Sequence, residues 1–258
     1  MKWAKLARRE LPFSKKKTTR EVGLSPAEAA SSTNHNHDVL PEDALRARCY
    51  RLLARFLSAP PGQDLLDSAA ALTGDDSELG RAIGALARVC AGSSAAAVAR
   101  EYHDLFIGLV RGELVPYGSY YLTGFLHEKP LAKLRRDMDR LGVARERGVA
   151  DPEDHVASLC EMMAGFIDGA LGPPRSLAEQ KAFYGAHIGS WAPVFFRDME
   201  TAKASVVYAA LGSVGRAFLA IEEEAFAMVE DEPAAAPEHG SDARGGERPQ
   251  DRTGRQGS

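Results

Sequence analysis

Apolar residues recur at helical spacing along most of the chain between residues 41 and 230. The first apolar stripe contains Leu45, Cys49 and Phe56. Pro41 opens this helix, and Pro60-Pro61-Gly62 closes it. The same period predicts helices over residues 63–72, 77–91, from about 95 to 108, 130–141, 152–171, 176–188, 191–203 and 204–230. No alternating apolar run is long enough for a sheet, so the pattern predicts a single compact all-α domain over residues 41–230.

Both ends of the chain lack this period. Residues 1–40 are basic and then rich in Ser, Thr, Asn and His, and residues 231–258 are rich in Pro, Ala, Gly, Arg and Glu. Because such segments bury too little apolar surface to offset chain entropy, we expect a disordered basic arm (1–40) and a disordered tail (231–258). Residues 1–20 carry eight basic side chains and one glutamate. The whole chain has a formal net charge of −4, so the remainder is acidic, which argues against a nucleic-acid binder.

The cysteines and the short motifs exclude several kinds of site. Cys49, Cys90 and Cys160 lie far apart and form no CxxC pair, which indicates reduced thiols in a cytoplasmic protein and no metal site. The chain contains no Gly-rich phosphate loop, no His-Glu-x-x-His zinc motif and no Gly-x-Ser-x-Gly elbow. We therefore expect no catalytic residues and no cofactor.

The apolar stretches do not predict a membrane span or an export signal. The longest of them, Ala204–Ile221, is interrupted by Arg216, which favours a buried amphipathic helix. The arginine pair Arg8-Arg9 is followed by lysines instead of the apolar run that a twin-arginine export signal needs. We expect that the chain is not itself exported.

Three segments contain residues that a simple helical bundle does not need. In the first, Tyr102, Leu105 and Phe106 share one face of a helix that stops at Gly108. These side chains could form part of a binding surface. Packing in the core is the alternative, and it suits Leu105 and Phe106 best.

The second segment crowds three tyrosines into residues 117–121. Pro116 holds its own φ and favours an extended conformation at the preceding residue, and Gly118 permits a sharp turn. Tyrosine combines a large apolar ring with a polar hydroxyl, which suits a surface that grips a peptide. A loop that packs its tyrosines against the body is an equal alternative.

The third segment, Asp151-Pro152-Glu153-Asp154-His155, precedes an apolar helix. We expect Asp151 to be the N-cap and Pro152 the first helical residue, with acidic side chains at the positive end of the helix dipole. This interpretation leaves His155 unexplained. Asp154 and His155 could instead present a carboxylate and an imidazole to a basic or polar ligand group.

In order and spacing, these segments resemble the TorD/DmsD family of redox-enzyme maturation chaperones, to which the NarJ-type chaperones are related. The resemblance spans about residues 42–228. The matching stretches are Tyr102-x-x-Leu105-Phe106-x-Gly108, Pro116-Tyr117-Gly118-Ser119-x-Tyr121, Glu153-Asp154-His155 and Trp191-x-Pro193-x-Phe195-Phe196.

The resemblance implies the all-helical fold of that family and a chaperone rather than an enzyme. The expected partner is the precursor of a molybdenum-cofactor oxidoreductase subunit, such as a formate dehydrogenase or a reductase. The chaperone would bind the twin-arginine signal peptide of this precursor in the cytoplasm and delay export until the cofactor is inserted, with transient proximity to the membrane translocon. The implied peptide-binding residues are Tyr102, Leu105, Phe106, Pro116, Tyr117, Ser119, Tyr121, Asp154 and His155.

Family members often have Trp at the positions of Tyr102 and Tyr117, which bears on the affinity for the peptide and on the choice of client.

Two other functions stay open from the sequence. A NarJ-like assembly factor would bind its client outside any signal peptide. An enzyme that uses Asp154 and His155 is a more distant alternative, since no phosphate-binding loop supports it.

Overall fold

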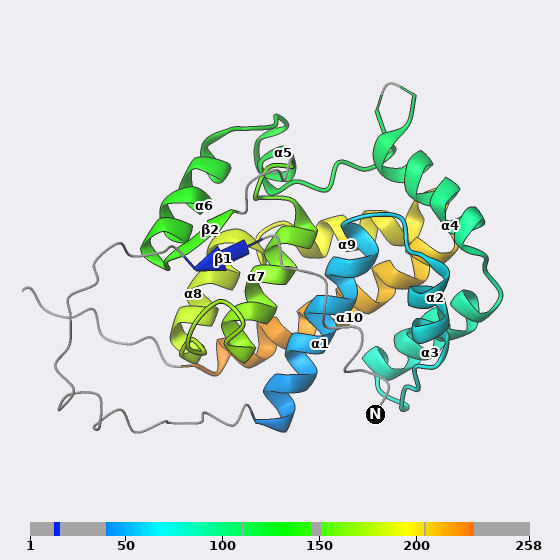
Figure 1. Cartoon of the computed structure of the whole chain (residues 1–258), viewed down its shortest axis with the longest axis horizontal. Coiled ribbons are helices and arrows are strands. Elements are labelled where there is room, and N and C mark those ends of the chain that lie inside the picture. The colour runs from blue at the N-terminus through cyan, green and yellow to red at the C-terminus, as the bar shows by residue number, and fades with distance from the viewer. Residues whose placement is uncertain (1–12, 16–39, 110, 146–150, 204, 230–258) are drawn as a thin grey trace, which may run out of the picture.

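The computed structural model describes residues 13–15, 40–109, 111–145, 151–203 and 205–229 (Figure 1). The predicted all-α class is confirmed. The helices are α1 (Pro41–Leu57), α2 (Gln63–Ala70), α3 (Glu78–Ala91), α4 (Ala95–Tyr102), the π-helix η3 (His103–Ile107), α5 (Gly118–Thr123), α6 (Lys129–Arg140), α7 (Val156–Asp168), α8 (Leu177–His187), α9 (Ala192–Thr201) and α10 (Val207–Ala227).

The core is built around α7. Ten of the 13 residues of this helix are buried, so most of its surface faces the core. It packs along α1, while α10 packs against both α9 and α3 (Figure 1). Cys160 of α7 is a small buried residue of this core.

Serine caps explain why three of the helices begin where they do. Ser77 and Ser94 each accept a hydrogen bond from a backbone N–H in the first turn, of α3 and α4 respectively. Ser176 and Glu179 form a reciprocal capping box at the start of α8. These starts agree with the predicted helices to within about one residue.

An ion pair joins the first long helix to the last. The Arg46 side chain donates two hydrogen bonds to the Glu222 carboxylate, at 2.7 and 2.9 Å. The Tyr50 hydroxyl donates a third, at 3.0 Å. Glu222 is only 1% exposed, so these donors replace its lost hydration.

A short two-stranded sheet was not predicted. β1 (Phe13–Lys15) pairs antiparallel with β2 (Val143–Arg145), with Phe13 opposite Arg145. Strands of three residues are too short to show an apolar alternation. β1 falls inside the segment that we predicted to be a disordered arm. The rest of residues 1–39 and the predicted tail lie outside the described residues.

Two other predictions need correction. The helix predicted over 152–171 begins only at Val156, because Asp151 is not its cap. The helix predicted from 95 to 108 changes to a π-helix at His103, and α5 lies between the predicted helices that end at 108 and begin at 130.

Within the described ranges, no single helix is both long and apolar enough to cross a membrane. α3 and the α4–η3 unit pass that test only when taken together, and a bend of 116° separates them.

Candidate functional site

The segment before α5 and the segment before α7 meet at one corner of the molecule. The Val156 N–H donates to the Pro116 carbonyl at 2.9 Å, and the Gly118 N–H donates to the Asp154 carbonyl at 3.0 Å. Between these two bonds lies an antiparallel bridge of single residues. The second and third sequence segments therefore form one local structure.

Asp154 holds the start of α5 from a distant part of the chain. One carboxylate oxygen, Oδ2, accepts the N–H of Ser119 at 2.7 Å. Asp154 is 3% exposed and Ser119 is fully buried. Because the first N–H groups of a helix lack partners within it, this carboxylate acts as a cap for α5.

His155 is the N-cap of α7. Its Nδ1 accepts the N–H of Ala157 at 3.1 Å, which requires that this nitrogen carry no proton. The side chain is almost fully buried, and this burial lowers its pKa to about 4 although nearby Asp151 and Asp154 favour the charged form. The imidazole is therefore neutral near pH 7. This cap corrects the prediction that Asp151 begins the helix.

Tyr117 and Asp151 lie over this buried pair. The Tyr117 ring meets the His155 ring edge to face at 4.9 Å, and its hydroxyl donates to Asp151 Oδ1 at 3.2 Å. Tyr117 is half-buried and Asp151 is exposed. Burial and the Asp151 charge raise the pKa of Tyr117 well above its ordinary value, so it stays a hydrogen-bond donor. We call Tyr117, Asp151, Asp154 and His155 the Tyr117 corner.

The role of Asp151 was missed by sequence reasoning. The run of acidic residues before α7 is visible in the sequence, but the contact with Tyr117 needs the fold to bring the two segments together. Asp151 supplies the exposed carboxylate of the corner, whereas Asp154 and His155 are turned inward and used as caps.

The first sequence segment forms a second aromatic group. The Tyr102 ring packs edge to face on Phe106 at 5.0 Å, and both rings contact Tyr208 of α10. Burial raises the pKa of Tyr102, and the charge of nearby Asp151 raises it further. Tyr102 and Phe106 are half-buried, whereas Leu105 is fully buried in the core. Leu105 therefore packs in the core, which was the alternative to a place on a binding surface.

Tyr121 belongs to a third group, with the late-helix motif. Its ring lies over Trp191 at 5.4 Å and meets Phe195 at 5.8 Å, and its hydroxyl donates to Asp198 at 3.0 Å. Trp191 and Phe195 are buried. Pro116, at the start of the segment, is buried as well.

Exposed apolar side chains lie in the last turn of α5 and directly after it. Leu122, Phe125 and Leu126 are 43%, 68% and 43% exposed. We call them the α5 apolar patch. α5 has six residues, so about 9 Å separates its ends and the patch lies close to the Tyr117 corner. The sequence analysis did not single out these residues.

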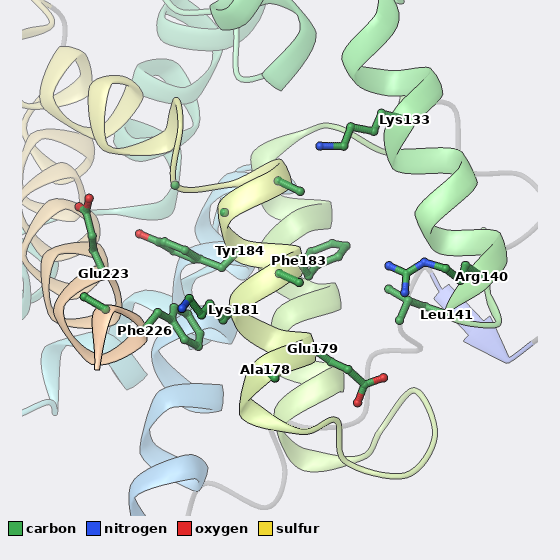
Figure 2. Close-up of a pocket in the computed structure, with 15 residues that line it drawn as sticks. Lys133, Arg140, Leu141, Ala178, Glu179, Lys181, Phe183, Tyr184, Glu223 and Phe226 are labelled. Carbon is green, nitrogen blue, oxygen red and sulfur yellow. The ribbon is translucent and has the colours of Figure 1, made fainter. Parts of the chain in front are cut away.

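A cleft of about 830 Å³ lies elsewhere, over the outward side of α8 (Figure 2). Lys133, Arg140 and Leu141 line it on one side, and Glu223 and Phe226 of α10 line it on the other. None of the nine predicted peptide-binding residues is among the residues that line it. The predicted peptide-binding residues therefore lie outside this cleft.

Potential metal ligands do not cluster in the part of the chain that the structure describes. No group of three or more His, Cys, Asp or Glu side chains lies close enough together there to hold a metal ion.

The sequence is similar to a family model and to proteins named as TorD chaperones. The family model described as the nitrate reductase delta subunit matches residues 72–197. The chaperone protein TorD of Vibrio cholerae is 28% identical over 129 residues, which cover 47% of this chain and 59% of that protein. TorD of Vibrio vulnificus strain YJ016 is 29% identical over 106 residues, which cover 38% of this chain and 49% of that protein. The match thus spans less than two thirds of the length of these relatives.

Among solved structures, a redox enzyme maturation protein from Archaeoglobus fulgidus aligns with a TM-score of 0.46 and 21% sequence identity. The alignment covers 68% of this chain and 94% of that protein.

Proposed function

We propose, from its similarity to the nitrate reductase delta subunit model and to TorD chaperones, that this chain is a redox-enzyme maturation chaperone that binds the signal peptide of a redox-enzyme precursor. The proposed client is the precursor of a molybdenum-cofactor oxidoreductase subunit, such as a formate dehydrogenase or a reductase. Binding in the cytoplasm would delay export until the cofactor is inserted and the client is folded.

The Tyr117 corner is the observation that carries the proposal. It joins two of the segments that resemble the family, and it exposes a carboxylate beside a tyrosine ring. Guanidinium groups bind carboxylates through paired hydrogen bonds and also stack on aromatic faces. The arginine pair of a twin-arginine signal would meet both groups here.

The α5 apolar patch suits the second part of such a signal. A twin-arginine signal continues with an apolar run, and Leu122, Phe125 and Leu126 offer apolar surface within one short helix of the corner. Burying roughly 400 Å² of apolar area at about 25 cal/mol/Å² would contribute on the order of 10 kcal/mol. Ordering and association costs would reduce this to about micromolar affinity, which still permits release.

Asp154 and His155 would act by positioning in this arrangement. Their side chains cap α5 and α7, so they set where Tyr117 and Asp151 lie without needing to touch the peptide. The same holds for Leu105, Pro116 and Ser119, which are buried. Tyr102, Phe106 and Tyr121 are half-buried, so part of each ring is open to a peptide.

A peptide-binding measurement tests the proposal on the full chain. The probe is a fluorescent peptide with an arginine pair followed by an apolar run, and the readout is anisotropy. Asp151→Asn should weaken binding about fivefold, as expected for one partly exposed ion pair. Phe125→Ser should weaken it roughly tenfold through lost apolar burial.

Asp64→Asn is the matched control, because Asp64 is an exposed acid on α2 and far from the corner in the chain. It should leave the affinity unchanged. The replaced side chains are all exposed, so the core stays intact in each variant. Equal affinity in the parent, Asp151→Asn and Phe125→Ser would place the peptide elsewhere or remove this function.

The family match supports one alternative, an assembly factor that binds its client outside the signal peptide. The matching family model is described as the nitrate reductase delta subunit. The measurement that separates the two is binding of a client precursor from which the signal has been deleted. Undiminished binding of the shortened client favours the assembly factor, and loss of binding favours the signal-peptide chaperone.

A further inference from the structure

The outward face of α8 is made of small residues. Ala182 and Gly185 are exposed, and Ala178 and Ala186 are half-buried along the same face. A Cβ added at Gly185 would meet no atom within 4 Å, so no described residue covers the helix there. Glycine forms helices less well than alanine, and nothing among the described contacts requires it at this position. Close approach of another stretch of backbone would explain it.

The last described residues of the chain lie at the rim of the same cleft. α10 ends at Ala227, and Phe226 and Ala227 both line the cleft. The Lys181 Nζ of α8 donates to the Val229 carbonyl at 2.8 Å, which fixes the last described residue beside α8. A further 29 residues follow, and they begin with Glu230-Asp231-Glu232-Pro233-Ala234-Ala235-Ala236-Pro237.

We propose that residues 230–237 of the carboxy-terminal tail dock along α8 and cover this cleft. Eight extended residues reach up to roughly 25 Å, whereas α8, with eleven residues, is about 16 Å long. The tail can therefore cross the whole face from its attachment at Val229. Its alanines and prolines are small enough to lie against the small side chains of α8.

Charge favours the same occupant. Three basic side chains, Lys133, Arg140 and Lys181, line the cleft, and the tail opens with three acidic residues. Arg140 lies 3.4 Å from Asp137, and Lys181 donates to the Val229 carbonyl. Two acids also line it, Glu223 and Glu179. Glu179 is engaged with Ser176 in the capping box and lies 3.4 Å from Arg175.

The tail in this position makes the α8 face a covered surface. Any partner that uses this face must first displace residues 230–237, so binding there competes with an intramolecular contact at high effective concentration. The proposal is independent of signal-peptide binding, because none of the nine predicted residues lines the cleft.

Disulfide trapping in the full chain tests the contact. The variant Ala182→Cys/Ala235→Cys should form an intramolecular disulfide under mild oxidation. Ala91→Cys/Ala235→Cys is the control, because Ala91 is exposed at the end of α3, at the opposite end of the molecule (Figure 1). The first pair should cross-link several-fold more than the control. The native Cys49 and Cys90 compete poorly, because burial raises the pKa of each to about 11.

Two substitutions in the same background show which features hold the tail. Replacing Glu230, Asp231 and Glu232 with lysines should lower the yield several-fold. Gly185→Ala should lower it too, because a methyl group would occupy the space that the tail backbone needs. Gly84→Ala, in the middle of α3, is its control and should leave the yield unchanged.

Three results would overturn the proposal. Equal yields in the Ala182→Cys and Ala91→Cys pairs would show that the tail has no preference for α8. An intermolecular disulfide would overturn it as well. A disulfide between the two Ala182→Cys sites of a dimer would mean that a second copy covers the cleft. A disulfide between Ala182→Cys of one chain and Ala235→Cys of another would mean that the chains exchange their tails. An unchanged disulfide yield with Gly185→Ala would contradict close packing of the tail backbone against α8.

Discussion

The imidazole of His155 accepts a hydrogen bond in its neutral form, which makes folding stability depend on pH. Its pKa is lowered from an ordinary 6.5 to about 4 by burial. The unfolded chain binds a proton here below about pH 6.5, whereas the folded chain does so only below about pH 4. Stability is therefore unaffected by this group above pH 6.5 and falls as the pH drops toward 4. Burial also lowers the pKa of His187, which acts in the same direction.

His155→Asn tests this contribution. Asparagine is a good N-cap but does not titrate, so the cap is kept while the pH dependence is removed. We expect the parent to lose about 2 kcal/mol more than the variant between pH 7 and pH 5, since one pKa unit corresponds to about 1.4 kcal/mol. Urea unfolding at both pH values measures it. Equal losses in the two proteins would contradict a titrating cap.

Asp154 and His155 show how much of a residue's role can be predicted from the sequence. Its place at the start of an apolar helix could be predicted, because the apolar period begins directly after it. Which way the two side chains point could not, because the partner of Asp154 is an N–H in a segment 35 residues away. The sequence also predicted Asp151 as the N-cap, because it precedes a proline and two acidic residues, but the structure shows that the N-cap is His155.

The π-helix η3 ends at a glycine that the backbone requires. Gly108 has φ of +61°, and its N–H donates to the His103 carbonyl at 2.7 Å. A Cβ at this position would lie 2.3 Å from the Arg111 carbonyl oxygen. Both the conformation and the lack of space therefore exclude a side chain.

Gly108→Ala should destabilise the protein by about 2 kcal/mol or more, through strain and the clash with the following loop. The paired variant Gly84→Ala has the opposite expected sign, a gain of about 0.5–1 kcal/mol, because Gly84 lies within α3 and its added Cβ would meet only the Arg88 side chain at 3.6 Å. Thermal unfolding compares them. A neutral effect of Gly108→Ala would mean that the loop relaxes freely.

The elements that the sequence did not predict are short. α5 has six residues and each strand has three, fewer than two periods of their repeats. The π-helix is also invisible to a period of 3.6, since its residues continue the apolar face of α4. The long helices were predictable because α1, α7 and α10 each carry several periods.

The ion pair between α1 and α10 ties the first long helix to the last. Glu222 is 1% exposed and accepts hydrogen bonds from Arg46 and Tyr50. Removing one member of such a pair leaves the other charge without its partner, which costs more than the pair itself contributes.

Glu222→Ala should lower the free energy of unfolding by about 3–5 kcal/mol. The double variant Arg46→Met/Glu222→Leu should lose much less, because no buried charge is stranded. A double-mutant cycle of Arg46→Met, Glu222→Leu and their double variant, measured by urea unfolding, gives the coupling energy. Additive effects of the two single changes would show that the residues are not coupled.

Contacts between residues so far apart in the chain could not be predicted from the sequence. Arg46 and Glu222 are 176 positions apart, and the sequence analysis singled out neither of them. The all-α class and the helix order followed from local periodicity. The corner, the cleft over α8 and the α1–α10 tie depend on how the helices pack, which local periodicity does not determine.

Neighbouring residues, Asp154 and His155, cap two different helices, and this predicts a shared opening event. If the loop before α7 opens, the Ser119 amide loses its acceptor at the same moment as the Ala157 amide. Under native-state hydrogen exchange both protons should then report the same opening free energy. His155→Ala should accelerate exchange at Ser119 although it removes no bond to that residue. A start of α5 that exchanges independently would show that the two helices open as separate units.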